Sequence, residues 1–327
     1  MKIAVLATQS LAKTIITPET KEKIRSLGEV VFNETDNTDP ETMKSLLQGA
    51  DIAVTSWGTP SLTKDLLDAA PNLKLVVHGA GSVKPIVTDE LYDRGIRVLS
   101  GAKVLSTGVS ETALGLTIAS LKNFFFLNQA AHGHGWNRTG VTELYGITVG
   151  IVGFGFAGRH YAELLRNFSV KVIAFDPGIS AESMAEVGVE KVELAEVFAR
   201  SQVVSLHAPQ LPSTYHIVNR ESLATMPDGA ILINTARGTL VDEMALAEAL
   251  LSGKLKCACL DVTDPEPMAE NNPLRKLSNC IITPHIAGQA SNGRLKLGDY
   301  CYDQICNYQT GKALDGEVTK AMLATIA

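Results

Sequence analysis

The chain has 327 residues, which is enough for two domains of ordinary size with their own hydrophobic cores. Hydrophobic residues make up 45% of it and charged residues 20%, a balance that is typical of globular proteins and excludes a disordered chain. The formal net charge is −6 and no basic cluster offsets it, so we expect no binding to nucleic acid or to an anionic membrane through charge.

The beginning of the chain is predicted to be a β-strand rather than a signal peptide. The apolar run that starts at Ile3 stops after five residues, before Thr8, which is short for the apolar region of a signal peptide. No apolar stretch is expected to reach the ~20 residues of a membrane span, because Lys122 and Asn123 interrupt the best candidate. We therefore predict a cytoplasmic protein without a membrane partner.

Short apolar runs alternate with helix-like segments along most of the chain. In chain order, the predicted strands are Ile3–Ala7, Val30–Phe32, Ile52–Thr55, Leu73–His78, Arg97–Val98, Thr148–Val152, Lys171–Ala174, Val203–Leu206, Ala230–Asn234, Cys257–Asp261 and Cys280–Thr283. The clearest predicted helices are Glu41–Gln48, Glu111–Leu127, Arg159–Asn167 and Glu243–Ser252. Most of these strands are rich in Val and Ile without alternation, as in strands buried on both faces of a parallel sheet. The pattern predicts an α/β fold with doubly wound parallel sheets.

The long run Ser110–Leu127 is interpreted as a helix that leads into a second domain. It ends in three phenylalanines, and a turn rich in Gly and His separates it from the strand at Thr148, which opens a new βαβ unit. The tail after about Ser291 contains no convincing strand, so we expect it to be helical and to pack back on the first domain. The five cysteines form no Cys-x-x-Cys pair, and we interpret them as free thiols; no metal site is predicted.

A glycine-rich segment lies between the strand Thr148–Val152 and the predicted helix Arg159–Asn167. Its sequence is Gly153-Phe154-Gly155-Phe156-Ala157-Gly158. The first glycine permits a tight turn, the second lets the backbone approach a pyrophosphate, and the third permits close packing of helix against strand. The start of the helix offers unpaired N–H groups to the phosphates. The segment therefore predicts a dinucleotide site.

Asp176 stands at the end of the next predicted strand, 18 residues after Gly158, which is the spacing of an acid that binds the adenosine ribose. Its carboxylate would repel a ribose 2′-phosphate, and the following residues Pro177–Ser180 include no Arg or Lys to attract one. NAD is therefore favoured over NADP.

Three polar clusters follow predicted strands at their C-terminal ends, where open α/β sheets bind ligands. They are Asn234–Gly238, Asp261–Pro267 and Thr283–Gly288, and together they contain a guanidinium, carboxylates and an imidazole. Hydride transfer to a 2-keto acid needs such a set, because a guanidinium binds a carboxylate with two hydrogen bonds and an imidazole exchanges a proton near neutral pH. A carboxylate beside the imidazole favours its protonated form, which acts as the acid in reduction.

By position alone, two histidines are equal candidates for the acid/base. His285 lies in the third cluster, and His207 follows another predicted strand, beside Ala208 and Pro209. Glu266 is likewise not distinguished from a solvated loop acid by its position. The residues by themselves leave these choices open.

Several motifs in order make the sequence resemble the D-isomer-specific 2-hydroxyacid dehydrogenase family, from about Val76 to Gly288. They are Gly79-Ala80-Gly81, Val109-Ser110-Glu111, Trp136 with Leu144-Tyr145-Gly146, the glycine-rich segment and the three clusters. The resemblance implies hydride transfer between NAD(H) and a small D-2-hydroxy acid or its 2-keto acid.

The family pattern, carried over residue by residue, implies roles for individual side chains. It makes Arg237 the binder of the substrate carboxylate, Glu266 the partner that raises the pKa of the histidine, and His285 the acid/base. The implied cofactor-binding residues are Gly153, Gly155, Phe156, Ala157, Gly158, Asp176, His207, Ala208, Pro209, Thr235, Ala236, Asp261 and Gly288. The residues whose backbone N–H groups are expected to face the substrate carboxylate are Gly79, Ala80, Gly81 and Ser82.

The resemblance also implies two domains with the active site in a cleft between them. Residues 1–102 and 289–327 would form a flavodoxin-like substrate domain, and residues 103–288 a Rossmann domain that binds NAD. Family members are typically homodimers joined through the cofactor domain, which makes Glu111–Leu127 the expected dimerising helix.

One departure from the family leaves the substrate undetermined. Many members follow the Gly79-x-Gly81 loop with Val-Asp, whereas this chain has Ser82-Val83-Lys84-Pro85. We hypothesise that Trp57, directly after the strand Ile52–Thr55, walls the pocket for the R group of the substrate.

Two other functions fit part of the pattern. Corepressors that resemble this family keep the dehydrogenase fold and bind NAD chiefly as a signal, so turnover of NADH with 2-keto acids would separate an enzyme from such a sensor. Formate dehydrogenase is the second alternative, but it removes no hydroxyl proton, and its relatives carry Gln where this chain has Glu266.

Overall fold

The computed structural model describes residues 1–326, which divide into two compact units. Unit 1 consists of Met1–Leu105 with Gly288–Ala327, and unit 2 of Ser106–Ala287. Each unit is built around its own parallel sheet and has its own hydrophobic clusters, so the predicted α/β fold with two parallel sheets is confirmed.

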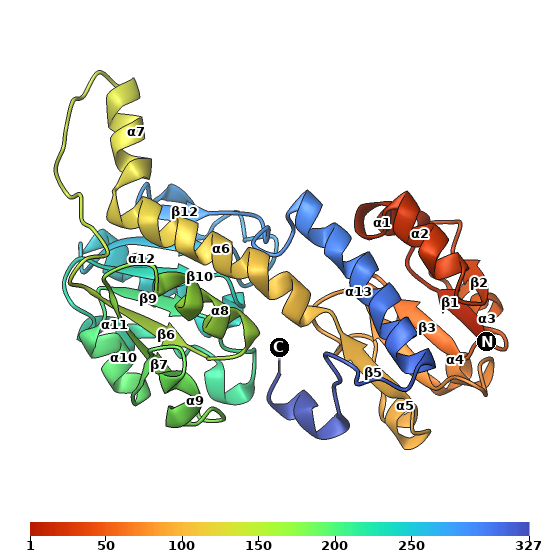
Figure 1. Cartoon of the computed structure of the whole chain (residues 1–327). Coiled ribbons are helices and arrows are strands. Elements are labelled where there is room, and N and C mark those ends of the chain that lie inside the picture. Colours follow the sequence, from red (N-terminus) through yellow and green to blue (C-terminus); the bar gives the residue numbers. More distant parts are fainter. Residues whose placement is uncertain (327) are drawn as a thin grey trace. The chain divides into compact units, whose positions relative to one another are not determined.

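Unit 1 contains a five-stranded parallel sheet in the order β2-β1-β3-β4-β5 (Figure 1). Its strands are β1 (Lys2–Val5), β2 (Glu29–Phe32), β3 (Ile52–Thr55), β4 (Leu75–His78) and β5 (Arg97–Ser100). Its helices are α1 (Gln9–Ile15), α2 (Pro18–Arg25), α3 (Pro40–Leu47), α4 (Lys64–Asp68), α5 (Asp89–Asp93), α13 (Ser291–Gln309) and the 3₁₀ helix η4 (Lys320–Ala324). The strand order reverses between β1 and β3, which makes their C-terminal ends the switch point of this sheet.

Successive residues of the strands in unit 1 face two different clusters, one on each side of the sheet. Ile52 and Val54 belong to the cluster that includes residues of α1, α2 and α13, whereas Ala53 belongs to the cluster that includes residues of α3, α4 and α5. This burial on both faces explains why the strands show no polar alternation. The helical tail predicted after Ser291 is α13, which places Leu297 and Cys301 in the first of these clusters.

Unit 2 contains a seven-stranded parallel sheet in the order β12-β11-β10-β9-β6-β7-β8. Its strands are β6 (Thr148–Val152), β7 (Lys171–Phe175), β8 (Glu190–Lys191), β9 (Val203–Leu206), β10 (Ala230–Asn234), β11 (Leu255–Leu260) and β12 (Cys280–Ile282). Its helices are α7 (Phe124–His132), α8 (Phe156–Leu165), α9 (Ala181–Ala185), α10 (Leu194–Arg200), α11 (Arg220–Thr225), α12 (Glu243–Leu251) and the 3₁₀ helices η1 (Pro212–Thr214), η2 (Gly238–Leu240) and η3 (Pro273–Lys276). Here the switch point lies between β6 and β9.

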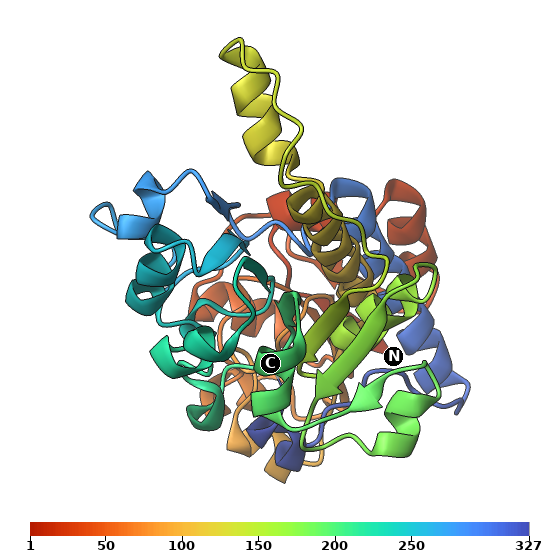
Figure 2. The same cartoon turned by 90° about the vertical axis from the view of Figure 1, so that its left-hand side faces the viewer.

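The prediction of one helix over Glu111–Leu127 is wrong, because this segment is divided between two helices. Helix α6 (Ala102–Leu121) begins earlier, in unit 1, and ends before Asn123, whose φ of 58° lies in the left-handed region. Asn tolerates that conformation better than most residues, so it permits a new helix, α7, to start at Phe124 in a different direction. Figure 2 shows α7 and the loop after it projecting from unit 2.

Helix α6 is also the one element among residues 1–326 that is long and apolar enough, by length and composition, to cross a membrane. The expectation that no segment reaches this length is therefore wrong. Its side chains nevertheless contact the interior of unit 2: the hydroxyls of Thr117 and Tyr161 lie 2.6 Å apart, and Ser120 Oγ lies 3.2 Å from Cys259 Sγ. We interpret α6 as a partly buried core helix.

Candidate active site

The glycine-rich segment turns sharply after β6, and at two of its glycines the backbone lies too close to neighbouring backbone atoms for a side chain to fit. Gly153 has a φ of 91°, and a Cβ at this position would lie 2.5 Å from the backbone nitrogen of Ala208. A Cβ on Gly158 would overlap the carbonyl oxygen of Gly153. At Gly155, by contrast, a Cβ would meet no atom within 4 Å. The segment thus packs tightly on the turn after β9 and leaves open space at its middle glycine.

The start of α8 and the end of β7 flank that open space. Helix α8 begins at Phe156, inside the glycine-rich segment and three residues earlier than predicted, so its first N–H groups belong to the segment itself. Asp176 Oδ2 accepts a hydrogen bond of 2.7 Å from the N–H of Phe154, and its Oδ1 accepts one of 2.8 Å from Gly178. These bonds fix the carboxylate beside the turn, and each oxygen retains a lone pair for a hydroxyl.

The residues present fit a dinucleotide. The cradle at Gly155, the helix start and the carboxylate of Asp176 provide sites for a pyrophosphate and a ribose. In the loop after β10, the hydroxyl of Thr235 is buried and has no hydrogen-bond partner. A buried hydroxyl without a partner is costly, and a polar group of a bound ligand would satisfy it.

His207 is partly buried, and its Nδ1 atom is inaccessible. Its Nε2 lies 2.9 Å from Ser205 Oγ, its Nδ1 has no partner, and its ring centroid lies 5.3 Å from that of Tyr161. Burial lowers the pKa of His207 to about 4, so the ring is neutral at pH 7. A neutral imidazole is poorly suited to donate a proton, which favours His285 over His207 as the acid/base.

Arg237 occupies the loop between β10 and η2, and close backbone contact places this loop against the next one. A Cβ on Gly238 would overlap the carbonyl group of Thr263, so only glycine permits this approach. The side chain of Asn234 braces the loop, donating to the carbonyl of Arg237 at 2.8 Å and accepting from the N–H of Ala236 at 3.0 Å.

The guanidinium of Arg237 is desolvated without a carboxylate counterion. Burial lowers the pKa of Arg237, and the charge of Glu266 opposes this shift. Its Nη1 donates to the carbonyl of Ala236 at 2.6 Å, and within residues 1–326 no carboxylate oxygen lies within 4.0 Å of its nitrogens. A small carboxylate would complete this site.

His285 and Glu266 form a hydrogen-bonded pair at the ends of β12 and β11. The Nδ1 atom of His285 lies 2.8 Å from Oε2 of Glu266, and the imidazole is 48% exposed. His285 has a φ of 54°, an uncommon conformation for a residue with a side chain, which indicates that its surroundings fix its backbone.

Asp261 holds the loop that carries His285. Its Oδ1 accepts hydrogen bonds from the hydroxyl of Thr283 at 2.5 Å and the N–H of Ile286 at 2.9 Å, and its Oδ2 accepts from the N–H of Ala287 at 2.8 Å. The residue is only 1% exposed. Its contact with a cofactor stays a prediction, whereas its hydrogen bonds to the loop that carries His285 are direct. Thr283 directly follows β12 and opens the cluster Thr283–Gly288, but no role was predicted for it; only its position after a strand could have indicated one.

The remaining predicted residues lie in unit 1. The Gly79–Ser82 loop follows β4, and the N–H of Gly79 donates to the carbonyl of Thr55 at 2.8 Å, so this N–H cannot face a substrate as expected. Trp57 follows β3 and lies below the guanidinium of Arg294, whose Cζ is 5.2 Å from the ring centroid. Gly288 begins the segment that returns to unit 1.

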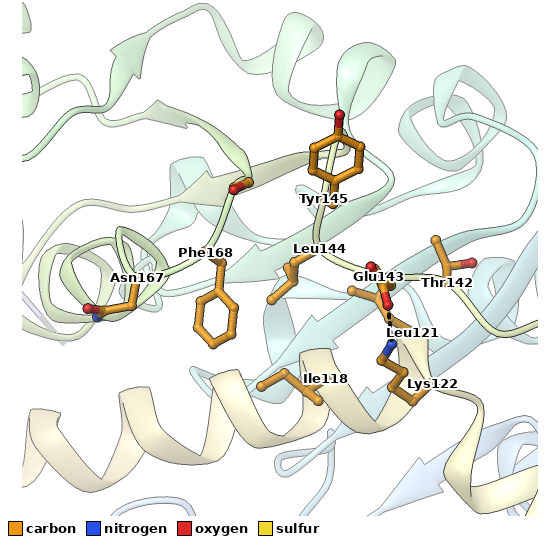
Figure 3. A pocket seen from close by; sticks show the side chains of 10 residues that line it. Ile118, Leu121, Lys122, Thr142, Glu143, Leu144, Tyr145, Asn167 and Phe168 are labelled. Atoms are coloured by element: carbon orange, nitrogen blue, oxygen red, sulfur yellow. Dashed lines mark hydrogen bonds and ion pairs between the residues drawn. The ribbon is translucent and has the colours of Figure 1, made fainter.

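A pocket of unit 2 lies among α6 and the segments 142–145 and 167–169 (Figure 3). Ile118, Leu144 and Phe168 form its apolar part, and an ion pair of 3.3 Å joins Lys122 to Glu143 at its side. None of the predicted site residues lines it. Among residues 1–326, no group of three or more His, Cys, Asp or Glu side chains could hold a metal ion.

Comparison with known proteins identifies the family. Residues 114–287 match the "D-isomer specific 2-hydroxyacid dehydrogenase, NAD binding domain". The chain is 33% identical to the hydroxypyruvate reductase of Thermotoga maritima over 274 residues, which cover 83% of the chain and 88% of that protein. The chain therefore belongs to the D-isomer specific 2-hydroxyacid dehydrogenase family, whose members use NAD.

Two further similarities define how far the likeness extends. The chain is 33% identical to the D-3-phosphoglycerate dehydrogenase of Methanocaldococcus jannaschii over 317 residues, which cover 95% of the chain but only 59% of that protein. The structure resembles that of a Thermus thermophilus protein with a TM-score of 0.78 and 28% identity, covering 98% of this chain and 100% of the other.

Proposed function

We propose that this protein interconverts a small 2-keto acid and the corresponding D-2-hydroxy acid with NAD(H). The observation that carries the proposal is a partly buried guanidinium without a carboxylate partner among residues 1–326, Arg237, in the loop next to an imidazole–carboxylate pair, His285 and Glu266. An anion binder next to a proton donor is the set that reduction of a 2-keto acid requires.

The glycine-rich segment would hold the cofactor. Gly155, the N–H groups of Phe156 and Ala157, and Asp176 would bind the pyrophosphate and the adenosine ribose, while Thr235 would face the nicotinamide end. NAD, when bound, donates or accepts the hydride. The Ala208 turn would form the wall of this site, because it lies against Gly153.

Each catalytic side chain has a separate role in the proposal. Arg237 binds the substrate carboxylate and so orients the adjacent carbonyl carbon. His285 donates a proton to the carbonyl oxygen during reduction and removes it during oxidation. Glu266 fixes the imidazole orientation through Nδ1, leaves Nε2 directed away, and places a negative charge beside the imidazolium. The later residues of the Gly79–Ser82 loop, together with Trp57, would supply further substrate contacts.

The experiment that tests the proposal is NADH oxidation with glyoxylate, hydroxypyruvate, pyruvate, phenylpyruvate and 3-phosphohydroxypyruvate. We expect at least one rapid substrate, and we expect Arg237→Ala to lower kcat/KM by about 10²-fold or more, because a buried pair of charge-assisted hydrogen bonds is lost. NADH binding without turnover of any 2-keto acid would instead favour the NAD-sensing, corepressor-like alternative.

The proposal includes a homodimer joined through α7 and the loop after it. This projecting segment exposes large apolar side chains, among them Phe124, Phe126, Trp136 at 84%, Val141 and Tyr145. A monomer rarely exposes so many neighbouring apolar groups, and a second copy of the chain would cover them. The five cysteines are free thiols, which fits the reducing environment of the cytoplasm.

A further inference from the structure

A guanidinium and an indole ring meet at the C-terminal edge of the sheet in unit 1. Arg294 lies in the first turns of α13, and its Cζ is 5.2 Å from the ring centroid of Trp57, in the segment that follows β3. Its Nη2 donates a hydrogen bond of 2.7 Å to the hydroxyl of Thr14 on α1, the helix that follows β1. Arg294 is thus held by side chains from the connections after β1 and β3.

These two connections flank the switch point of the sheet. The strand order β2-β1-β3-β4-β5 reverses between β1 and β3, and open α/β sheets bind ligands outside the carboxyl ends of the strands at this point. The position of Arg294 therefore coincides with the place where this sheet geometry favours a ligand.

The charge of Arg294 is not neutralised by the protein. Within residues 1–326 no carboxylate oxygen lies within 4.0 Å of its guanidinium, whereas Arg97 in the same unit forms a two-pronged pair with Glu317 at 2.6 and 2.7 Å. The Nε of Arg294 is buried and has no hydrogen-bond partner. A buried N–H of a cation without an acceptor is costly, and the guanidinium as a whole carries a charge that no carboxylate balances, so binding of an anion through its accessible nitrogen would be favourable.

The indole makes this guanidinium suitable for recognition. The contact with Trp57 and the hydrogen bond to Thr14 restrain the long side chain, and they leave Nη1, which is not buried and has no partner among residues 1–326, as the donor that can reach an anion. A purely structural role would be served equally well by an apolar side chain over the ring.

We propose that Arg294, in contact with Trp57 and anchored by Thr14, binds an anionic group of the substrate, so that the preferred substrates are 2-keto acids whose R group carries a carboxylate or a phosphate. The assignment of a 2-keto acid rests on the proposed function; the anion site itself does not. Arg294 is then a specificity-determining residue, separate from Arg237, which binds the carboxylate common to all substrates.

Turnover of matched substrates tests this specificity. Oxaloacetate and 4-methyl-2-oxopentanoate have R groups with the same number of heavy atoms, one charged and one apolar, and 3-phosphohydroxypyruvate and hydroxypyruvate form a second pair that separates a phosphate from a carboxylate. We expect kcat/KM to be higher for the acidic member of at least one pair. Arg294→Met should lower that preference about 10- to 100-fold and leave the neutral member within about 2-fold.

Two variants complete the turnover experiment. Lys296→Met removes an equal charge from a position two residues away, and should leave the preference unchanged. Arg294→Lys keeps the charge without the planar fork, and should retain part of the preference, which guards against a folding defect in the Met variant. A preference for the neutral substrates, or an equal loss on both members of a pair in Arg294→Met, would overturn the inference.

Binding without turnover separates this inference from the proposed reaction. The chain has two tryptophans, so Trp136→Phe leaves Trp57 as the single indole emitter. Titration with malonate should change the emission of Trp57 in this background, and the change should be absent when Arg294→Met is added. No change with malonate or with inorganic phosphate would contradict the anion site, even if the enzyme reduces 2-keto acids. If malonate changes the emission of Trp57 but the protein turns over no 2-keto acid, the anion site would be supported and the proposed reaction rejected.

Discussion

The imidazole of His285 is the side chain on which the proposed proton transfer depends. Its Nδ1 is occupied by Glu266 at 2.8 Å, so the opposite nitrogen is the one that can exchange a proton with a substrate oxygen. We expect His285→Ala to lower kcat about 10²- to 10⁴-fold, the usual contribution of a general acid/base, while the affinity for NADH stays within about 3-fold. Stopped-flow reduction and NADH fluorescence titration measure the two quantities. An equal loss of both would assign the residue to cofactor binding.

Two histidines make the stability of the fold depend on pH: His78, which is buried, and His207, which is partly buried with an inaccessible Nδ1. Burial lowers the pKa of each to about 4, and the unfolded chain titrates near 6.5. Both forms are neutral above pH 6.5, so stability is complete there and falls as the pH drops from about 6.5 towards 4. We expect a loss of about 1–2 kcal/mol per histidine between pH 7 and pH 5.

Denaturant titrations at pH 7 and pH 5 measure this effect. Replacing His78 or His207 by Gln should reduce the difference between the two pH values, and the exposed His132→Gln should not change it. The same difference in all three variants would exclude these two histidines as its cause.

Two loops of unit 2 contain glycines in opposite surroundings, so substitutions there can distinguish a loss of stability from a loss of cofactor binding. A Cβ on Gly238 would overlap the backbone of Thr263, whereas a Cβ on Gly155 would meet no atom within 4 Å. Gly238→Ala should therefore destabilise the fold by about 1–3 kcal/mol, because the two loops must separate. Gly155→Ala should leave the unfolding midpoint unchanged and raise the Kd for NADH by occupying the proposed pyrophosphate space. A stable Gly238→Ala variant with full activity would contradict the loop packing described for Arg237.

The elements also show how far the sequence can be interpreted. Buried strands such as β3, β6 and β10 were predicted with their observed bounds, because long runs of Val, Ile and Leu occur in parallel strands covered on both faces. Strand β8 was missed because its two residues, Glu190 and Lys191, pair only with β7 at the edge and carry no apolar pattern. The division between α6 and α7 was missed because apolar residues resume directly after Lys122 and Asn123, and neither of these two residues is a glycine or proline that would signal a break.

The site could be predicted only in part. Chemistry at strand ends predicts the loops of Arg237 and His285 as parts of the site, but position alone does not separate His285 from His207; the bond of His285 to Glu266 and the low pKa of His207 favour His285, whose role stays a prediction. Arg294 was missed because it lies on a helix, without a motif, and its neighbours Trp57 and Thr14 are more than two hundred residues away in sequence. Such contacts depend on tertiary structure and leave no local pattern.

At the scale of the whole molecule, the exposed apolar side chains of α7 predict association. Phe124→Glu with Phe126→Glu should convert a dimer into a monomer, because each charge would be buried at the contact without a partner. Light scattering after size-exclusion chromatography measures the mass, and the control is Leu251→Glu, an equally apolar exposed position on α12. A dimer that survives the double substitution would place the interface elsewhere.

Transfer of deuterium from the cofactor to the substrate is a direct measure of the proposed hydride transfer to C2 of a 2-keto acid. Reduction of the best 2-keto acid with NADH that carries deuterium at both positions of C4 of the nicotinamide ring should yield a hydroxy acid of D configuration with deuterium at C2, detected by NMR and chiral chromatography. Binding of NADH and the keto acid without deuterium at C2 would contradict the account, as would a product of L configuration.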